Sequence, residues 1–370
     1  MTSKTQYLPG AHPSLPPPAS TVGVVGWLRT NLFSNATNTL LTLMAGYLVY
    51  LLVPPVISWV FINADLSGDS RDACTSGGAC WVFIKARFGQ FIYGFYPSAE
   101  RWRVDTTFIL LVMLLVPLFI EGFRKKALLG AFLIFVFPVI GFYLLAGGSF
   151  GLVEVETSLW GGLSLTIVIA VVGIVGSFPL GLLLALGRRS KMPAVSTFCT
   201  GFIELWRGVP LITVLFMSSV MFPLFLPEGV NFDKLIRALV GVTLFSAAYM
   251  AEVVRGGLQA IPKGQYEGAE ALGLSYWKSM GFIILPQALK HVIPGIVGTF
   301  IGLFKDTTLV LIIGLYDFLG IVQAASTDPK WLGYSVEGYV FCAFVYFVFC
   351  FSMSQYSQSL ERKLHTGHKR

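Results

Sequence analysis

Residues 267–286 read EGAEALGLSYWKSMGFIILP, a comparatively hydrophilic stretch that lies between long apolar segments. The composition of residues 265–278 favours a helix, with Gly273 as the expected break and Pro286 as a later kink. We therefore predict a short helix along a membrane surface. The spacing that distinguishes this stretch is carried by Glu267, Ala269, Gly273, Ile283, Leu285 and Pro286.

The composition is that of an integral membrane protein. Of the 370 residues, 55% are hydrophobic and 12% are charged, and the mean hydropathy is +0.73. Soluble domains carry about 25% charged residues. The formal net charge of +7 would suggest a nucleic-acid partner for a soluble protein. Here the basic residues follow the positive-inside rule instead, so we expect a lipid bilayer and no nucleic acid.

Eight segments have the roughly 20 largely apolar residues that a spanning helix needs. Clusters of Lys and Arg fall on one side of them, which the positive-inside rule makes cytoplasmic. With eight spans both termini share that side, and the stretch that starts at Glu267 lies there too. The predicted spans are 39–62, 106–121, 127–146, 158–187, 196–224, 235–254, 291–315 and 337–360.

The spans fall into two blocks. Residues 39–150 hold three spans and a large external loop at 63–105, and residues 151–370 hold five spans and the hydrophilic loop at 255–286. The glycine-rich run at 147–151 marks the boundary between the blocks.

The first 38 residues are predicted as a cytoplasmic tail, because residues 1–20 are polar and rich in proline. Residues 22–33 place apolar side chains on one helical face, which fits a helix lying in the membrane interface. The frayed start of the first span is an equal alternative for these residues.

Cys74 and Cys80 lie in the polar run RDACTSGGACW of the external loop. A metal site would need more ligands, and no histidine is near. A disulfide that closes a small loop is one prediction if the loop faces an oxidising compartment. Two free thiols are the alternative, because sequence does not give the geometry.

The sequence lacks the motifs of a nucleotide-binding or zinc-dependent enzyme, and its G-x-S-x-G string at 147–151 links two predicted spans instead of a strand and a helix. It has no G-x-x-x-x-G-K-[ST] string to cradle a nucleotide and no H-E-x-x-H string, and its four histidines are scattered. We therefore expect no catalytic, cofactor or metal site in this chain, and we predict that it is not an enzyme.

Charged residues within the predicted spans are the candidates for a solute site, since each costs several kcal/mol in the membrane. Lys305 and Asp306 are adjacent, so they do not face each other on a helix. They match the carboxylate and ammonium groups of an amino acid, with Thr307 and Thr308 as hydrogen-bond donors. Salt bridges between helices, or packing at a gate, are equal alternatives.

A second group of charged residues lies near the predicted cytoplasmic side. Tyr249 and Glu252 precede Arg255 at the end of the sixth span, where they line a gate or cavity or anchor the interface. Glu204 and Arg207 are predicted to form a structural i,i+3 pair.

The stretch at 267–286 resembles the cytoplasmic coupling motif of binding-protein-dependent ABC importers. That motif runs E-A-A, three residues, G, nine residues, I, one residue, L-P, and every spacing matches. One position departs, Gly268, where the family has alanine. Further stretches resemble the polar-amino-acid family of importer permeases: 158–190, 202–216, 247–275 and 304–314. The front half, at 26–35, 79–97 and 100–105, is similar to the M-type permease subunits of broad-specificity L-amino-acid importers.

The resemblance implies an all-α polytopic fold, with the five-helix core of a type I ABC importer permease preceded by three N-terminal helices. It implies a translocation pathway for L-amino acids that works by alternating access. A permease for one specific polar amino acid and an ion-coupled secondary transporter are the alternatives. The residues that would couple to an ATPase are Glu267, Gly268, Ala269 and Gly273.

The resemblance also implies partners in a bacterial inner membrane. They are a homologous, non-identical second permease subunit, two ATPase subunits and a periplasmic binding protein that delivers the amino acid. ATP and magnesium would be bound by the ATPase subunits, so no cofactor is expected in this chain.

Overall fold

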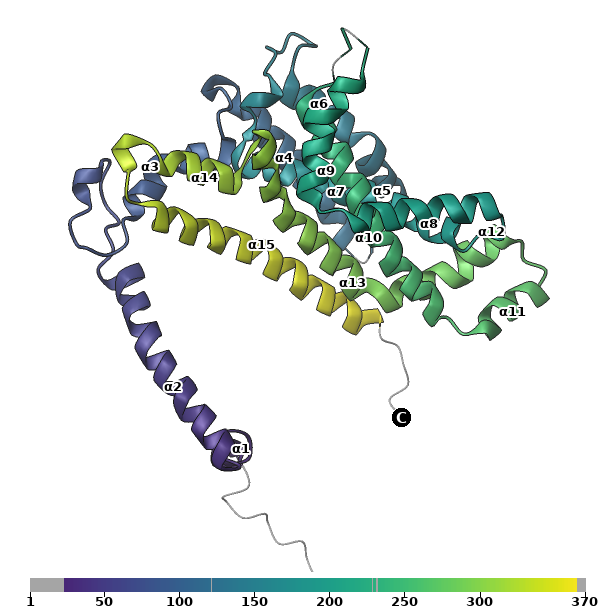
Figure 1. The fold of residues 1–370 in the computed structure, drawn as a ribbon, viewed down its shortest axis with the longest axis horizontal. Helices are drawn as coiled ribbons and strands as arrows, with labels where there is room; N and C mark the ends of the chain where they lie inside the picture. The colour runs from purple at the N-terminus through teal and green to yellow at the C-terminus, as the bar shows by residue number, and fades with distance from the viewer. Residues whose placement is uncertain (1–22, 121, 228, 231, 365–370) are drawn as a thin grey trace, which may run out of the picture. The chain divides into compact units, whose positions relative to one another are not determined.

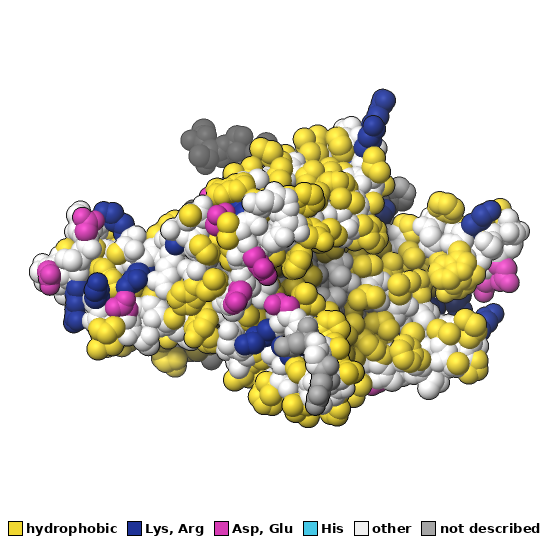
Figure 2. Space-filling view, turned by 90° about the horizontal axis from the view of Figure 1, so that it is seen from above, with side chains coloured by type: hydrophobic (Ala, Val, Ile, Leu, Met, Phe, Trp, Pro, Cys, Tyr) yellow, Lys and Arg dark blue, Asp and Glu magenta, His cyan; other side chains and the backbone are white. Residues whose placement is uncertain are grey.

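The structure is a computed structural model that is almost wholly helical (Figure 1). It describes residues 23–120, 122–227, 229–230 and 232–364. The predicted tail up to residue 22 therefore lies outside the described residues. Hydrophobic side chains cover much of the surface, and charged side chains gather in a few groups (Figure 2). An all-α membrane fold accounts for this distribution, because lipid replaces water around the apolar helix faces.

The chain divides into two compact units, and the first contains residues 1–68 and 72–81. Its helices are α1 (Gly23–Asn31) and α2 (Ala36–Ile57), and α2 continues as a π turn to Ile62. The Asn35 side chain caps α2 by accepting from the amide of Asn38 at 2.8 Å. None of the side chains of α2 is buried within the chain.

The segment of this unit that carries Cys74 and Cys80 bonds to Asp65. The structure pairs Cys74 with Cys80, with their Cα atoms 5.6 Å apart, which lies within the range of disulfides. Ser76 donates to the Asp65 carboxylate from its amide at 3.1 Å and from its hydroxyl at 2.8 Å. The Ser76 hydroxyl bond, then the amide bond, lower the pKa of Asp65.

The second unit contains residues 69–71 and 82–370, so the second and third predicted spans belong with the core. Its first helices are α3 (Trp81–Tyr93), of which Trp81 itself belongs to the first unit, α4 (Arg101–Phe119), α5 (Lys126–Phe135) and α6 (Phe137–Ala146). Leu111 of α4 packs with Leu133 and Phe137 in a small apolar cluster.

The core helices follow in chain order. They are α7 (Gly162–Arg188), α8 (Pro193–Gly208), α9 (Leu211–Phe216), α10 (Lys234–Ala260), α11 (Lys263–Ala271), α12 (Tyr276–Ser279), α13 (Leu285–Asp306), α14 (Phe318–Ser326) and α15 (Ser335–Leu364). Helix α10 packs along α7 and α13 (Figure 1). A Cβ on Gly181 would lie 2.6 Å from the Met250 Cβ, and one on Gly257 would lie 2.6 Å from the Ala288 carbonyl oxygen. Small residues thus allow the close contact of these helices.

The number of membrane-spanning helices agrees with the prediction. Within the described residues, seven helices are long and apolar enough to cross a membrane, and one bent pair makes an eighth. The seventh predicted span starts earlier than expected, because the helix runs from Tyr276 to Ile313. Pro286, expected to kink the chain, follows the π turn Met280–Ile284. The wider turn accommodates a residue that lacks an amide hydrogen.

The predicted span over 196–224 is broken by a sharp bend. Helix α8 and the helical segment Leu211–Phe225 are bent by 101° relative to each other. Pro210 donates no amide hydrogen, and it forces Val209 into an extended conformation with φ −116° and ψ 136°. The break therefore falls at Gly208-Val209-Pro210.

Three backbone segments meet where α7 begins. Gly94 pairs with Trp160, Gly161 with Tyr316 and Gly162 with Asp317. We call this meeting point, residues 94, 160–162 and 316–317, the glycine clasp. Gly94 has φ +64°, and a Cβ there would lie 2.4 Å from the Gly161 Cα, so only glycine fits without strain. The clasp joins the segment before α4 to the core.

Helix α3 is held against the core close to α14. Arg87 of α3 forms an ion pair with Asp328, and the ring centroids of Phe83 and Trp331 lie 5.5 Å apart. These contacts and the clasp place the α3–α4 connection at the end of the core opposite to α11.

Candidate functional site

The predicted coupling helix is present as α11, between α10 and α13. It begins after Pro262 and ends before Gly273, whose φ is +69°. The Leu274 amide donates to the Ala269 carbonyl at 3.2 Å, and the Gly273 amide donates to the Glu270 carbonyl at 2.9 Å. This is the Schellman pattern, in which a glycine in the left-handed region ends the helix. The structure therefore confirms that the helix ends at Gly273, as predicted.

The predicted coupling residues divide between an outer and an inner face of α11. Glu267 and Gly268 are exposed, and a Cβ on Gly268 would meet no atom within 4 Å. Ala269 is only 2% exposed and packs inward. Its small side chain therefore packs within this chain. Within the described residues Glu267 has no ion-pair partner, so its carboxylate can accept hydrogen bonds from another protein.

Two side chains of α11 form hydrogen bonds with neighbouring helices, and a third, that of Ala269, is buried. The Gln287 amide of α13 donates to the Gln265 side-chain oxygen at 3.1 Å. Tyr266 donates from its hydroxyl to the Leu258 carbonyl of α10 at 3.1 Å, and the same hydroxyl accepts from Arg189 at 3.1 Å.

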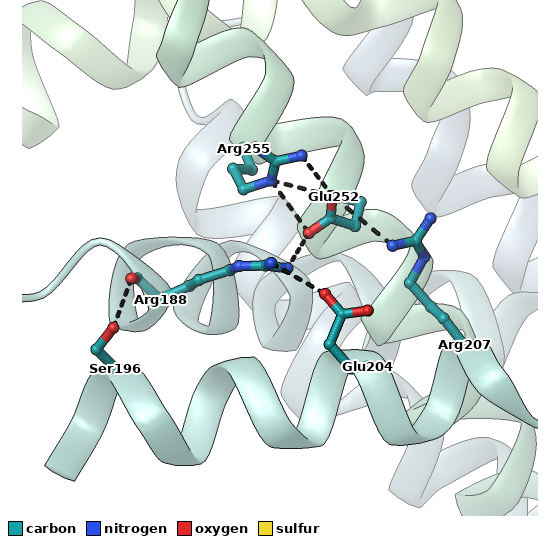
Figure 3. A network of polar contacts seen from close by, with 6 residues as sticks. All are labelled: Arg188, Ser196, Glu204, Arg207, Glu252 and Arg255. Carbon is teal, nitrogen blue, oxygen red and sulfur yellow. Dashed lines mark hydrogen bonds and ion pairs between the residues drawn. The ribbon is translucent and has the colours of Figure 1, made fainter. Parts of the chain in front are cut away.

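A network of five charged residues joins α7, α8 and α10 (Figure 3). Glu252 of α10 is its centre and accepts from Arg188 Nη1 at 2.5 Å and from Arg255 Nη2 at 2.7 Å. Arg207 Nη1 lies 3.7 Å from the Glu252 carboxylate, and Arg188 Nη2 also donates to Glu204 at 2.9 Å. The three guanidinium groups offset the burial of the Glu252 carboxylate, which is 15% exposed.

This network replaces the predicted pair of Glu204 with Arg207. The ion pair of Glu204 is with Arg188 of α7, and that of Arg207 is with Glu252 of α10. The reason is the bend at Pro210, which lays α8 against the ends of α7 and α10, where charged residues of other helices lie within reach.

Tyr249 lies beside the same network. Its ring centroid is 5.6 Å from Arg207 Cζ and 5.0 Å from the Phe245 centroid. It is 38% exposed. These contacts place Tyr249 with the charged residues of α8, and none of them connects it to Lys305 or Asp306.

Lys305 and Asp306 form the last residues of α13, where a 3-10 turn begins. Lys305 is exposed and Asp306 is half-buried, and neither side chain has an ion pair within the described residues. Thr307 is 1% exposed and donates to the Phe304 carbonyl at 2.8 Å, and Thr308 donates to the Lys305 carbonyl at 3.0 Å. Both hydroxyl hydrogens are thus engaged by the backbone of their own helix, which differs from their predicted role as donors to a solute.

A groove with a volume of about 710 Å³ lies elsewhere, along α8, α9 and α10. Its lining is apolar and includes Trp206, Met217, Phe225 and Phe232. The predicted solute residues do not line it.

Sequence reasoning missed two residues that the structure places at contacts between elements. Arg189, at the end of α7, contacts α10 and α11. Asp317 is fully buried at the glycine clasp, where it caps α14 by accepting from the amides of Gly320 and Leu319 at 3.0 and 3.2 Å. Burial raises the pKa of Asp317, and the two amide bonds oppose that rise. An aspartate directly before an apolar helix was the signal for this cap.

Comparison with known proteins identifies the family. The family model described as "Binding-protein-dependent transport system inner membrane component" matches residues 177–366. The inner membrane amino-acid ABC transporter permease protein YhdY of Escherichia coli K12 is 56% identical over 357 residues, 96% of this chain and 97% of that protein. The glutamate/glutamine/aspartate/asparagine transport system permease protein BztC of Rhodobacter capsulatus is 41% identical over 423 residues, with 96% of each chain covered.

A solved structure of an amino acid ABC transporter with histidines is also similar, with 28% identity and a TM-score of 0.49 over 55% of this chain and 92% of that one. The family model covers more than half of the chain, and both relatives match nearly all of it. The chain therefore belongs to the family of binding-protein-dependent transport system inner membrane components.

Proposed function

We propose that the chain is the permease subunit of an ATP-driven, binding-protein-dependent importer of L-amino acids. Support comes from the family match and from two relatives that are described as amino-acid permeases along their whole length. The observation that carries the proposal is α11. It is a short helix with an exposed carboxylate, it ends at a left-handed glycine, and it lies between two membrane spans.

The side of the membrane follows from the basic residues. Arg188, Arg189, Arg255 and Lys263 lie at the end of the core that carries α11, and the positive-inside rule places such residues in the cytoplasm. Both termini then share that side, in a multi-pass protein of a bacterial inner membrane. The glycine clasp and the loop with Cys74 and Cys80 face the periplasm, where a disulfide between these two cysteines is stable.

The proposed mechanism is alternating access driven from outside this chain. Two ATPase subunits bind ATP and magnesium and dock on α11 and its counterpart in a homologous, non-identical second permease. A periplasmic binding protein delivers the amino acid. Nucleotide-driven closure moves α11, and the spans change between two packings that open the pathway to opposite sides. This chain supplies positions and contacts and no covalent chemistry.

Lys305 and Asp306 remain our candidates for contact with the solute. They lie at a helix end within the membrane, unpaired within the described residues, which is an arrangement that a carboxylate and an ammonium group would stabilise. Broad specificity for L-amino acids fits a site that binds the groups common to all of them.

Affinity purification from native membranes tests the assembly. The tagged chain should retain an ATPase, a second permease of the same family and, in the presence of an amino acid, a periplasmic binding protein. A chain that purifies without any nucleotide-hydrolysing protein, yet transports an amino acid in liposomes, would be a secondary transporter instead.

A further inference from the structure

The two arginines at the end of α7 contact different parts of the protein. Arg188 is directed to Glu252 and Glu204 in the charged network (Figure 3). Arg189 donates from Nη1 to the Leu258 carbonyl of α10 at 2.9 Å and to the Tyr266 hydroxyl of α11 at 3.1 Å. Arg188 thus connects α7 to α8 and α10, and Arg189 connects α7 to α11.

Tyr266 joins three elements with one side chain. Its hydroxyl accepts from Arg189 and donates to the Leu258 carbonyl, 3.1 Å away in each case. Its ring centroid lies 5.5 Å from Arg189 Cζ, a distance at which a cation and an aromatic ring attract each other. The ring also packs against the apolar cluster that contains Leu258. Arg189, Tyr266 and Leu258 form what we call the α7–α10–α11 joint.

The other attachments of α11 lead elsewhere. Gln265 bonds to Gln287 of α13, and Ala269 is buried through its apolar methyl group. A helix of nine residues is too short to be stable by itself. The position of α11 is therefore set by a few contacts, and the joint alone ties it by hydrogen bonds to both α7 and α10 within the described residues.

We propose that Tyr266 and Arg189 are positioning residues that transmit the displacement of α11 to the ends of α7 and α10. This inference rests on the proposed function. A partner that moves α11 moves the Tyr266 hydroxyl, and the shared bonds with Arg189 and Leu258 make the ends of two spans follow. Without the hydroxyl, α11 keeps its packing through the ring and Ala269, but α7 is no longer bonded to it.

The test uses the complete complex with its binding protein in proteoliposomes. Tyr266→Phe removes the hydroxyl and keeps the ring, and Arg189→Gln removes the charge. Each should lower the amino acid transported per ATP hydrolysed by about three- to tenfold, the range expected for one lost hydrogen bond. The double variant should lose no more than the larger single loss, because both changes remove the same contact. Arg189→Lys keeps a charged donor, so its transport per ATP hydrolysed should lie between that of Arg189→Gln and that of the wild type.

Two matched controls separate coupling from general damage. Tyr276→Phe makes the same chemical change on α12, and Lys191→Gln removes a charge just beyond the joint. Both should leave the transport ratio at the wild-type value.

Three outcomes would contradict the proposed role of the joint. The first is an unchanged ratio in both Tyr266→Phe and Arg189→Gln. The second is a ratio that falls only because the ATPase subunits no longer co-purify, which would mean a docking role. The third is strictly additive losses in the double variant. A wild-type complex that shows no ATP-dependent uptake would instead contradict the proposed function, on which the role of the joint rests.

Discussion

Glu252 of α10 accepts a hydrogen bond from Arg188 of α7, with Oε1 and Nη1 2.5 Å apart. This contact fastens two 27-residue helices at the end that carries α11. Because Arg207 and Arg255 bind the same carboxylate, one carboxylate contacts three guanidinium groups from three helices. The arrangement makes Glu252 a determinant of how the core packs.

Glu252→Gln should destabilise the chain by about 1.5–3 kcal/mol, the range for losing a hydrogen bond to a charged group. It leaves Arg188, Arg207 and Arg255 facing one another around a neutral amide. Glu204→Gln is the matched control, because Glu204 is 57% exposed and an exposed ion pair is worth about 0–1 kcal/mol. Thermal unfolding in detergent compares the two, and equal losses would contradict the central role of Glu252.

Glu267→Arg should uncouple uptake from ATP hydrolysis while the chain still inserts and folds. The exposed carboxylate of α11 becomes a cation, which reverses its interaction with donors on a docked ATPase. Glu361→Arg makes the same change at an exposed position of α15 and should have little effect. Uptake and ATP turnover are measured together in proteoliposomes. Wild-type uptake in Glu267→Arg would argue against α11 as the docking element.

Lys305→Met should raise the apparent KM for the amino acid, or abolish uptake, without lowering the unfolding temperature. Lys305 is exposed and has no ion pair within the described residues, so its loss costs no packing. Lys290→Met removes an exposed charge near the start of the same helix and serves as the control. A loss of stability with unaltered dependence on amino-acid concentration would favour a packing role for Lys305.

Gly94→Ala should destabilise the protein by about 1–3 kcal/mol, as expected for a side chain forced into the left-handed region. The added Cβ would also lie 2.4 Å from Gly161 Cα. Gly130→Ala, in α5 with no atom within 4 Å of the new Cβ, should instead stabilise by about 0.5–1 kcal/mol. Unfolding temperatures of the two variants should therefore change in opposite directions, and a neutral Gly94→Ala would contradict the close approach at the clasp.

The spans and the break in the coupling helix could be predicted because local properties decide them. Long apolar runs must be helical in lipid, where every backbone group needs a partner. Gly273 could be recognised because a left-handed helix end favours glycine. The bend at Pro210 also has a local cause, because proline donates no amide hydrogen. The length of the apolar run allowed a break there, but hydrophobicity alone does not distinguish a straight span from a broken one.

The pairs of the charged network could not be predicted in the same way. Spacing suggested Glu204 with Arg207, yet their partners lie on other helices, 16 and 45 residues away in sequence. The burial of Ala269 and the joint of Arg189 with Tyr266 depend on how α11 folds back against other parts of the core. Such contacts follow from tertiary packing, which a single sequence does not display.

Uptake by the reconstituted complex tests the central claim most directly. The account predicts that liposomes with both permeases, the ATPase subunits and the binding protein accumulate L-amino acid only when ATP is present inside with the ATPases, and that this chain alone accumulates none. Accumulation by the isolated chain, or uptake by the complex that is indifferent to ATP, would contradict the account.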